Sequence, residues 1–325
     1  MIFDMHGDIW TDVTVKRMNG SKNIIKTNHL DRFKKGNMLG GIFVVWIDPP
    51  HDKRPFDRLI ENLIEISKEI LDSDDVIYIV KEKEDLAKAI NENKLAVVMG
   101  LEGLSSIDKN IELIYPLYEF GFRHASLTWN EENNLATGID GDVSRGITNK
   151  GKDVIKIMED LNMIIDVSHA NEKTFWDIVN CTKGPIIASH SNAKAICNHK
   201  RNLSDEQIKA IGDKKGLIGV NSFHKFVHHD KERQNILTLA DHIEHIAYLI
   251  GIDHVAFGFD FFDYLSSEST SSFSANDSNA IPDMKDISQV YKLIDVLLER
   301  GFSNEEIDKI SYMNFMRYFT EFRDA

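Results

Sequence analysis

The sequence contains only two cysteines among its 325 residues, Cys181 and Cys197. Two thiols give no disulfide framework, and we expect both to be structural side chains of a protein in a reducing compartment. No apolar run approaches the ~20 residues that a membrane span requires. No basic segment followed by an apolar stretch precedes the first predicted strand. These absences favour a cytoplasmic protein that does not insert into membranes.

Positive charge is also scarce. The chain has 38 Lys and Arg against 52 Asp and Glu, a formal net charge of −14. This negative excess argues against nucleic acid or an anionic membrane surface as the main partner. Glycine-rich phosphate loops, a Gly-x-Ser-x-Gly elbow and a defensible Cys–His nucleophile pair are absent as well.

Short apolar runs that alternate with amphipathic segments make up most of the chain. The runs are almost uniformly apolar, as expected for strands that are covered on both faces. They comprise residues 2–8, 41–47, 94–102, 123–128, 163–168, 185–189, 216–221 and 255–259. Eight such runs, each usually followed by a helical pattern, predict one α/β domain over residues 1–325. Its expected architecture is a (β/α)₈ TIM-like barrel with inserted loops and closing C-terminal helices.

Helical spacing of apolar residues predicts the segments between the strands. The predicted helices comprise residues 58–72, 85–93, 111–120, 151–161, 172–179, 204–210, 237–250, 287–300 and 304–319. Residues 11–40 are expected to form a long polar stretch with helical character only at 29–35. Residues 264–281 are rich in Ser and Asn and are expected to form a long loop.

Metal-ligating residue types stand at the ends of the predicted strands. In chain order they are His6, Asp8, Glu102, His169, His190 and Asp260. His6 and Asp8 are two residues apart, so a strand would project both to the same side. The carboxyl ends of barrel strands all open onto one face, where active sites form. Three imidazoles and several carboxylates suffice for two divalent ions, with Glu102 or Asp8 as the bridging ligand.

Each of these residues also has a less specific interpretation. A strand-end carboxylate such as Asp166 often caps a helix or faces solvent, although Asp166 could also orient a histidine. Two further histidine groups, in segments 224–229 and 242–245, have helical spacing. The first is flanked by charges and is expected to face solvent, and the second lies on a long amphipathic segment. The joint occurrence at successive strand ends, rather than any single residue, favours the metal site.

Several motifs together resemble one known family. They are Asp4–Asp8, Gly100–Gly103, Ser126–Asn130, Asp166–His169, Ser189–Asn192, His199–Ser204, Val255–Asp260, and Leu297–Ser303 with Asn314. In this combination and order the chain resembles the membrane dipeptidase (renal dipeptidase) family of zinc peptidases, which is related to the amidohydrolase barrels. The resemblance runs almost from end to end. The signal peptide, lipid-anchor tail and disulfides of the animal proteins are not found in this sequence.

The resemblance implies a set of metal ligands. His6 and Asp8 would bind one Zn²⁺, His169 and His190 would bind the other, and Glu102 would bridge the two. Other divalent ions are compatible with the same ligands. The implied cofactor is therefore a pair of Zn²⁺ ions.

The resemblance also implies a reaction. A metal-bridging hydroxide would attack the amide carbon of a dipeptide, including dipeptides with a C-terminal D-residue. Asp260 would hydrogen-bond the bridging water and pass its proton to the leaving amine. Arg201 would pair with the C-terminal carboxylate of the substrate. A homodimer is expected from the resemblance and from the frequency of dimers in general.

Two positions depart from the animal enzymes. Trp129 stands where they have a histidine, and Phe223 aligns with a tyrosine. Trp129 is either a packing residue or part of the pocket wall, and both residues are candidates for substrate contact. Two alternatives therefore stay open. The chain could be a related metal-dependent amide or lactam hydrolase that acts on a small acylated or cyclic amino acid, or a non-catalytic metal-binding barrel.

Overall fold

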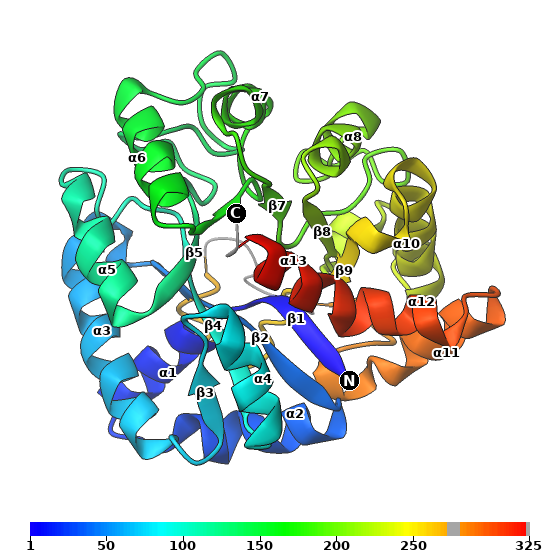
Figure 1. Cartoon of the computed structure of the whole chain (residues 1–325), viewed down its shortest axis with the longest axis horizontal. Helices are drawn as coiled ribbons and strands as arrows, with labels where there is room; N and C mark the ends of the chain where they lie inside the picture. Colours follow the sequence, from blue (N-terminus) through cyan, green and yellow to red (C-terminus); the bar gives the residue numbers. More distant parts are fainter. Residues whose placement is uncertain (272–279, 323–325) are drawn as a thin grey trace.

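A closed ring of parallel strands forms the centre of the molecule in the computed structural model, which describes residues 1–271 and 280–322 (Figure 1). The strands are β1 Ile2–Gly7, β2 Met38–Trp46, β3 Ile77–Ile79, β4 Leu95–Glu102, β5 Phe122–Ser126, β6 Ile164–Asp166, β7 Ile187–Ala188, β8 Leu217–Val220 and β9 Val255–Phe257. Eight of them pair in the order β1, β2, β4, β5, β6, β7, β8, β9, and β9 pairs again with β1. The predicted barrel is confirmed.

Strand β3 was not predicted from the sequence. It pairs with the first residues of β4, Ile77 with Leu95 and Ile79 with Val97. Strand β5 pairs with the later part of β4, from Met99 onward. Strand β3 therefore lies outside the ring of eight, and its three residues give too short a period to distinguish a strand from a loop.

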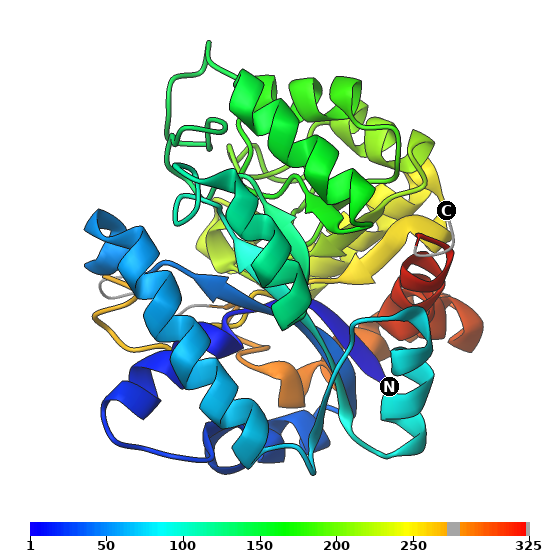
Figure 2. The same cartoon turned by 60° about the vertical axis from the view of Figure 1, so that its left-hand side comes forward.

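Helices surround the ring of strands in both views (Figure 1 and Figure 2). They are α1 Ile9–Met18, α2 Leu30–Lys35, α3 Pro55–Asp72, α4 Lys83–Asn91, α5 Ile114–Phe120, α6 Asn149–Asp160, α7 Glu172–Cys181, α8 Asp205–Asp213, α9 His224–Val227, α10 Ile236–Ile250, α11 Tyr291–Glu299, α12 Asn304–Asp308 and α13 Asn314–Phe322. No described helix has the length and apolar character needed to cross a membrane.

Helix α1 corrects the expectation of a polar, largely non-helical stretch from residue 11 onward. Its inward face carries polar side chains, which hide the helical period of apolar residues. Thr14 Oγ1 donates to Asn62 Oδ1 of α3 at 2.7 Å, and Thr11 Oγ1 donates to the Trp46 carbonyl oxygen of β2 at 3.3 Å. Of the predicted 264–281 loop, residues 272–279 lie outside the described residues.

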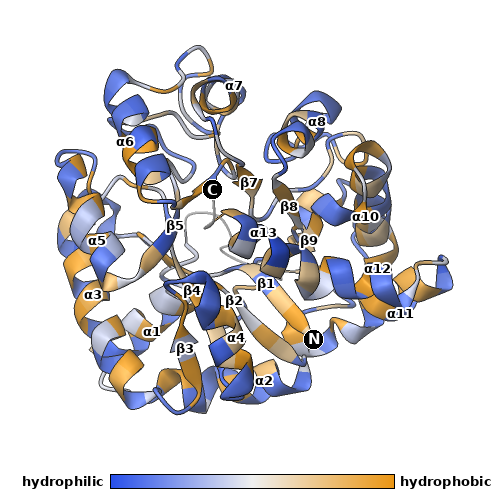
Figure 3. Cartoon of the chain, viewed as in Figure 1, coloured by the Kyte–Doolittle hydropathy of each residue, from blue (hydrophilic) through white to orange (hydrophobic). Residues whose placement is uncertain are grey.

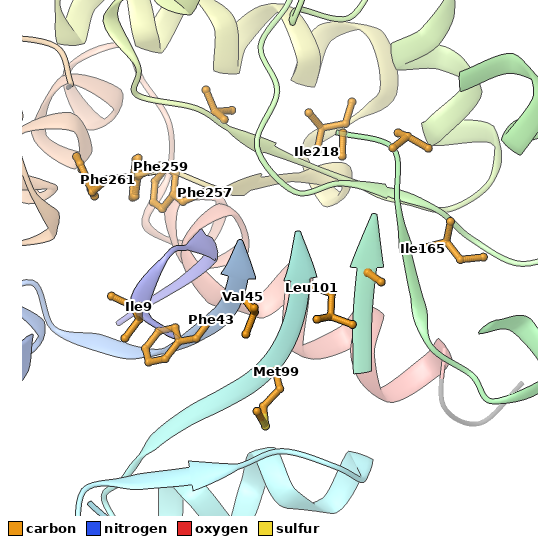
Figure 4. Close-up of a cluster of buried hydrophobic side chains, with 14 of the residues drawn as sticks. Ile9, Phe43, Val45, Met99, Leu101, Ile165, Ile218, Phe257, Phe259 and Phe261 are labelled. Atoms are coloured by element: carbon orange, nitrogen blue, oxygen red, sulfur yellow. The ribbon is translucent and has the colours of Figure 1, made fainter. Parts of the chain in front are cut away.

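Apolar side chains fill both sides of the strands, which are mainly apolar in the hydropathy colouring (Figure 3). One core lies between strands and helices and includes Ile9, Phe43, Val45, Met99 and Leu101 (Figure 4). A second core fills the inside of the barrel and includes Phe3, Ile42, Val98, Leu217 and Phe315.

Helix α13 closes the amino end of the barrel. The ring of Phe315 stacks on Phe3 at 3.9 Å between ring centroids. Asn314 Nδ2 donates to the carbonyl oxygens of Ile252 and Val255, each at 2.8 Å. Because this end is packed shut, a ligand reaches the barrel from the carboxyl ends of the strands.

Candidate metal centre and active site

Strand β1 places His6 and Asp8 at the carboxyl end of the barrel. Asp4 Oδ1 accepts hydrogen bonds from the backbone N–H of His6 and of Phe259, at 3.3 and 2.9 Å, and so joins the ends of β1 and β9. The His6 side chain is 1% exposed, yet neither ring nitrogen has a hydrogen-bond partner among the described residues. Asp8 occupies the N-cap position of α1, but its side chain makes no capping bond and its Oδ1 has no hydrogen-bond partner in the described part of the chain. Helix capping therefore does not account for Asp8.

Glu102 ends strand β4 and faces histidines with both of its oxygens. Oε1 lies 2.8 Å from His169 Nε2 and 3.6 Å from His190 Nε2. Oε2 lies 3.6 Å from His6 Nε2. The next residue, Gly103, has a φ of +70°, and a Cβ there would lie 2.7 Å from the Trp129 nitrogen. The chain therefore turns sharply after Glu102 and leaves both carboxylate oxygens at the centre of the cluster.

The imidazoles of His169 and His190 point their Nε2 atoms at each other, 2.8 Å apart. Their Nδ1 atoms are already engaged, His169 with Asn130 Oδ1 at 2.7 Å and His190 with Ser189 Oγ at 2.7 Å. These bonds assign the ring protons to Nδ1, because Asn130 Oδ1 only accepts and the Ser189 hydroxyl donates elsewhere. Two Nε2 lone pairs then face each other, an arrangement that a cation between them would stabilise.

Asp166 lies behind this pair rather than in it. The Ser189 hydroxyl donates to Asp166 Oδ2 at 2.5 Å, and Asp166 Oδ1 accepts from the backbone N–H of Ser168 and Ser189. Asp166 is 2% exposed, so it is neither solvated nor a helix cap. It orients His190 through Ser189, one of the alternatives that the sequence left open.

His169 and Asp260 both have left-handed backbones, with φ of +69° and +58°. Such conformations cost energy for residues other than Gly and Asn, and they concentrate at functional sites. Asp260 follows strand β9, where its Oδ1 lies 3.8 Å from His6 Nε2 and its Oδ2 accepts a hydrogen bond from Asn221 Nδ2 at 3.1 Å.

The negative charge of the carboxylates in this cluster is only partly balanced by the positive charge of the imidazoles. Burial raises the pKa of Asp260 to about 6 and, together with Glu102, holds the pKa of Asp8 well above its usual range. Burial alone would lower the pKa of His6, but Glu102, Asp260 and Asp8 together raise it to about 10. Burial and then Arg201 lower the pKa of His169 to about 4. Acidic groups in this cluster attract positive charge that the imidazoles supply only in part.

The donor atoms fit divalent cations. Among the residues that the structure describes, two groups have ligand atoms that all lie within 4.8 Å of one another: His6 with Glu102 and His190, and His6 with Asp8 and Asp260. Imidazole nitrogen and carboxylate oxygen are ligands for Zn²⁺ and for related ions. These groups share His6, whereas the family resemblance implies that the histidines are divided between two ions. The five predicted ligands converge, and their assignment to individual ions stays a prediction.

A pocket opens above the cluster, and the three predicted substrate contacts, Arg201, Trp129 and Phe223, line it. Arg201 is 6% exposed, and its Nε and Nη2 have no hydrogen-bond partner among residues 1–271 and 280–322. Further lining residues that the sequence analysis did not select are Trp46, His199, Phe226 and Phe262. Each follows a strand or belongs to a motif, but only the folded chain shows which of them face the pocket.

The two other histidine groups do not join this cluster. His224 is 7% exposed and stacks on Phe223 at 4.8 Å, so the expectation that its segment faces solvent is wrong for this residue. His242 is fully buried: Nδ1 accepts from the Ala193 backbone N–H at 3.1 Å, and Nε2 lies 2.9 Å from the Val227 carbonyl oxygen. These contacts give His242 a structural role.

A parallel barrel with imidazoles and carboxylates gathered at its carboxyl end defines a metal-dependent hydrolase of the barrel class. The sequence model of the membrane dipeptidase family (peptidase family M19) matches residues 1–325. The chain therefore belongs to this family and is a dipeptidase, a metal-dependent hydrolase.

One relative and two solved structures are similar to this chain over most of its length. An uncharacterized Klebsiella pneumoniae protein encoded in the 5′ region of pqqA is 33% identical over 273 residues, which cover 81% of this chain and 95% of that protein. The crystal structure of the M19 metallopeptidase called dipeptidase AC has a TM-score of 0.87 at 19% identity and covers 100% of this chain and 99% of its own. A Rhodobacter sphaeroides metallopeptidase, liganded with a phosphinate mimic of L-Ala-D-Ala, has a TM-score of 0.84 at 20% identity and covers 98% of both chains. The two structures share the fold of this chain.

Proposed function

We propose that this dipeptidase uses two divalent ions, zinc by preference, held by His6, Asp8, Glu102, His169 and His190. The observation that carries the proposal is the position of Glu102, whose two oxygens face different histidines across a buried space. A carboxylate in this position suits a bridging ligand, because each oxygen can bind one ion. When bound, the ion pair would activate water and polarise the carbonyl group of the scissile amide.

Asp260 is the proposed proton carrier. It lies beside His6 and lines the pocket, and Asn221 fixes one of its oxygens, which leaves the other directed at the cluster. A carboxylate in this place can take a proton from the attacking water and deliver it to the leaving amine. Its strained backbone supports a functional rather than a packing role.

Arg201 is the proposed partner of the substrate's C-terminal carboxylate. Within the described residues, Nε and Nη2 of this buried guanidinium have no hydrogen-bond partner, so no anion there accompanies it. A carboxylate would pair with it through two hydrogen bonds, which selects substrates with a free C-terminus. Trp129 and Phe223 form an apolar part of the wall of the same pocket, where they would contact the side chains of the substrate.

We further propose that a D-residue is accepted at the C-terminal position. The family resemblance supports this, as does the dipeptide mimic with a D-Ala end that the Rhodobacter sphaeroides neighbour binds. The cytoplasmic location and the homodimer stay predictions from the sequence.

A substrate panel tests the proposed function. Purified protein is assayed on L,L- and L,D-dipeptides, on their N-acetyl derivatives and on small lactams, before and after treatment with a chelator and re-addition of Zn²⁺. We expect free dipeptides to be cleaved, activity to vanish with the chelator and to return with zinc. Faster cleavage of N-acetyl substrates or lactams would favour the related amide hydrolase, for which the apolar Trp129 and Phe223 provide the argument. If the zinc-loaded protein cleaved none of these substrates, the remaining alternative would be a non-catalytic metal-binding barrel.

A further inference from the structure

Two aromatic clusters line the pocket. Trp46, at the end of β2, and Trp129, just after β5, have ring centroids 5.2 Å apart. Phe223, Phe226 and Phe262 follow β8 and β9, and the ring of Phe223 lies 4.8 Å from Phe226 and 5.7 Å from Phe262. We call these the Trp pair and the Phe cluster. Together they make a pocket wall far more aromatic than the metal chemistry itself requires.

The order of the strands places the two clusters on opposite sides of the barrel. The Trp pair stands on β2 and β5, which flank β4 in the ring, and the Phe cluster stands on β8 and β9. In a ring of eight strands, β8 is four positions from β4 in either direction. The metal-ligand cluster lies between the two walls, because its residues come from β1, β4, β6 and β7 ends.

Specific contacts show which aromatic cluster lies next to Arg201 and which lies next to the metal-ligand residues. The Arg201 guanidinium lies 5.4 Å from the Phe226 ring centroid, so Arg201 belongs to the Phe side of the pocket. Trp46 is the register partner of Glu102, and Trp129 lies 5.9 Å from His169 between ring centroids. The Trp pair therefore lies next to Glu102 and His169, whereas Arg201 lies against the Phe cluster.

We infer that the enzyme prefers dipeptides with apolar, above all aromatic, side chains, and that each cluster binds one end. The inference rests on the proposed function, in which Arg201 holds the terminal carboxylate. With the carboxylate at Arg201, the C-terminal side chain lies against the Phe cluster. The scissile amide then lies over the metal-ligand cluster, and the N-terminal side chain reaches the Trp pair.

The chemistry of the walls supports this choice of substrate. Aromatic rings gain from burial and from offset or edge contacts with other rings, whereas a charged side chain would lose its hydration there. Ile139 adds a further apolar surface to the same pocket. An apolar side chain of substrate thus gains free energy of transfer at either end.

The experiment compares kcat/KM for Phe-Ala, Ala-Phe and Ala-Ala with zinc-loaded protein. The ratio of Phe-Ala to Ala-Ala reports the N-terminal site, and the ratio of Ala-Phe to Ala-Ala reports the C-terminal site. Both ratios are expected to exceed about ten in the native chain, as a buried aromatic side chain permits. Trp129→Ala should lower the first ratio about tenfold and the second less than about threefold, and Phe226→Ala should do the reverse.

Three further measurements keep the test decisive. Trp129→Leu and Phe226→Leu repeat it with smaller cavities, in case an alanine variant does not fold. Tyr248→Ala removes an aromatic ring that is 86% exposed on α10 and should change neither ratio. Equal effects of both substitutions on both ratios, or a native preference for Ala-Ala, would overturn the inference. Cleavage of Ala-Ala separates that result from a failure of the proposed function, in which no dipeptide is cleaved.

Discussion

Two buried groups of charged side chains in this molecule differ in one respect. Around Glu69 on α3, which is fully buried, every oxygen has a partner: Oε2 accepts from Arg17 at 2.5 Å, and Oε1 accepts from the Ile25 backbone N–H at 2.8 Å and from Ser73 Oγ at 3.1 Å. Around Glu102, which is 6% exposed, the ring nitrogens of His6 and one oxygen of Asp8 have no hydrogen-bond partner among the described residues. The two groups are buried to a similar degree, but both oxygens of Glu69 have hydrogen-bond partners, whereas several buried polar atoms around Glu102 have none among the described residues.

This difference separates a structural cluster from a binding site. In the first group both oxygens of Glu69 are hydrogen-bonded and Arg17 faces the carboxylates of Glu65, Glu69 and Asp72, and these contacts hold α1 and α3 together. Buried donors and acceptors without partners carry a desolvation cost, which a bound ligand can offset. The comparison therefore supports the proposal that cations bind in the group around Glu102, and substitutions in the two groups should have opposite signatures.

The largest effect is expected from Glu102→Gln. An amide has one oxygen and no charge, so it cannot bridge two cations. We expect loss of metal together with a fall in kcat/KM of about 10⁴-fold or more, since metal binding and chemistry both depend on this residue. Metal content by atomic emission and turnover of a dipeptide check it. Two zinc ions retained per chain in the variant would rule out the bridging role.

Asp260→Asn should come next. The amide can keep the hydrogen bond with Asn221 after a flip, but it cannot take up a proton. We expect both metals to stay bound while kcat falls about 10²- to 10⁴-fold, the range for loss of a general acid–base group. The same two assays apply, and turnover at the native rate would exclude a proton-transfer role.

Glu69→Gln is the matched substitution in the closed cluster. It leaves Arg17 without its shortest carboxylate contact, and loss of one partner of a buried pair destabilises a protein by about 3 kcal/mol. We expect that loss of unfolding free energy in urea, with metal content and kcat unchanged. If this variant lost metal as Glu102→Gln does, the distinction between the two clusters would be mistaken.

Ser189→Ala tests the support of the open cluster. The substitution removes the hydroxyl group that links Asp166 to His190 by hydrogen bonds, and the His190 ring is then free to rotate or to change tautomer. Metal affinity should fall about 10- to 100-fold, the usual effect of removing a residue that orients a ligand. Competition with a chromophoric chelator measures it. Unchanged affinity would show that Asp166 and Ser189 only pack.

The last prediction concerns pH. Burial raises the pKa of Asp4 to about 7 from an ordinary 3.8, so the folded chain holds this proton more tightly than the unfolded chain. The stability that the protonated group contributes is complete below pH 4 and is lost as the pH rises through 7. Without metal, the native chain should lose about 2–4 kcal/mol relative to Asp4→Asn between pH 4 and 8. Parallel urea curves for the two proteins would contradict this.

The sequence predicted the barrel because its strands are buried on both faces and contrast with the amphipathic helices. It also predicted the strand-end residues, since parallel strands bring distant segments such as His6 and His190 to one face. It missed α1, whose inward face mixes polar with apolar side chains, and β3, which is too short to show a period. Asn130 and Ser189 stand in the quoted motifs and Asn221 does not, but the role of all three comes only from their contacts in the folded chain, because polar residues are common in loops.

A metal titration tests the central claim most directly. Protein stripped with a chelator is given increasing zinc, and dipeptide hydrolysis is followed together with the number of ions bound per chain. The claim predicts no hydrolysis without metal and full activity when two ions are bound per chain. Full activity of the stripped protein, or of protein that binds no zinc at the Glu102 cluster, would contradict it.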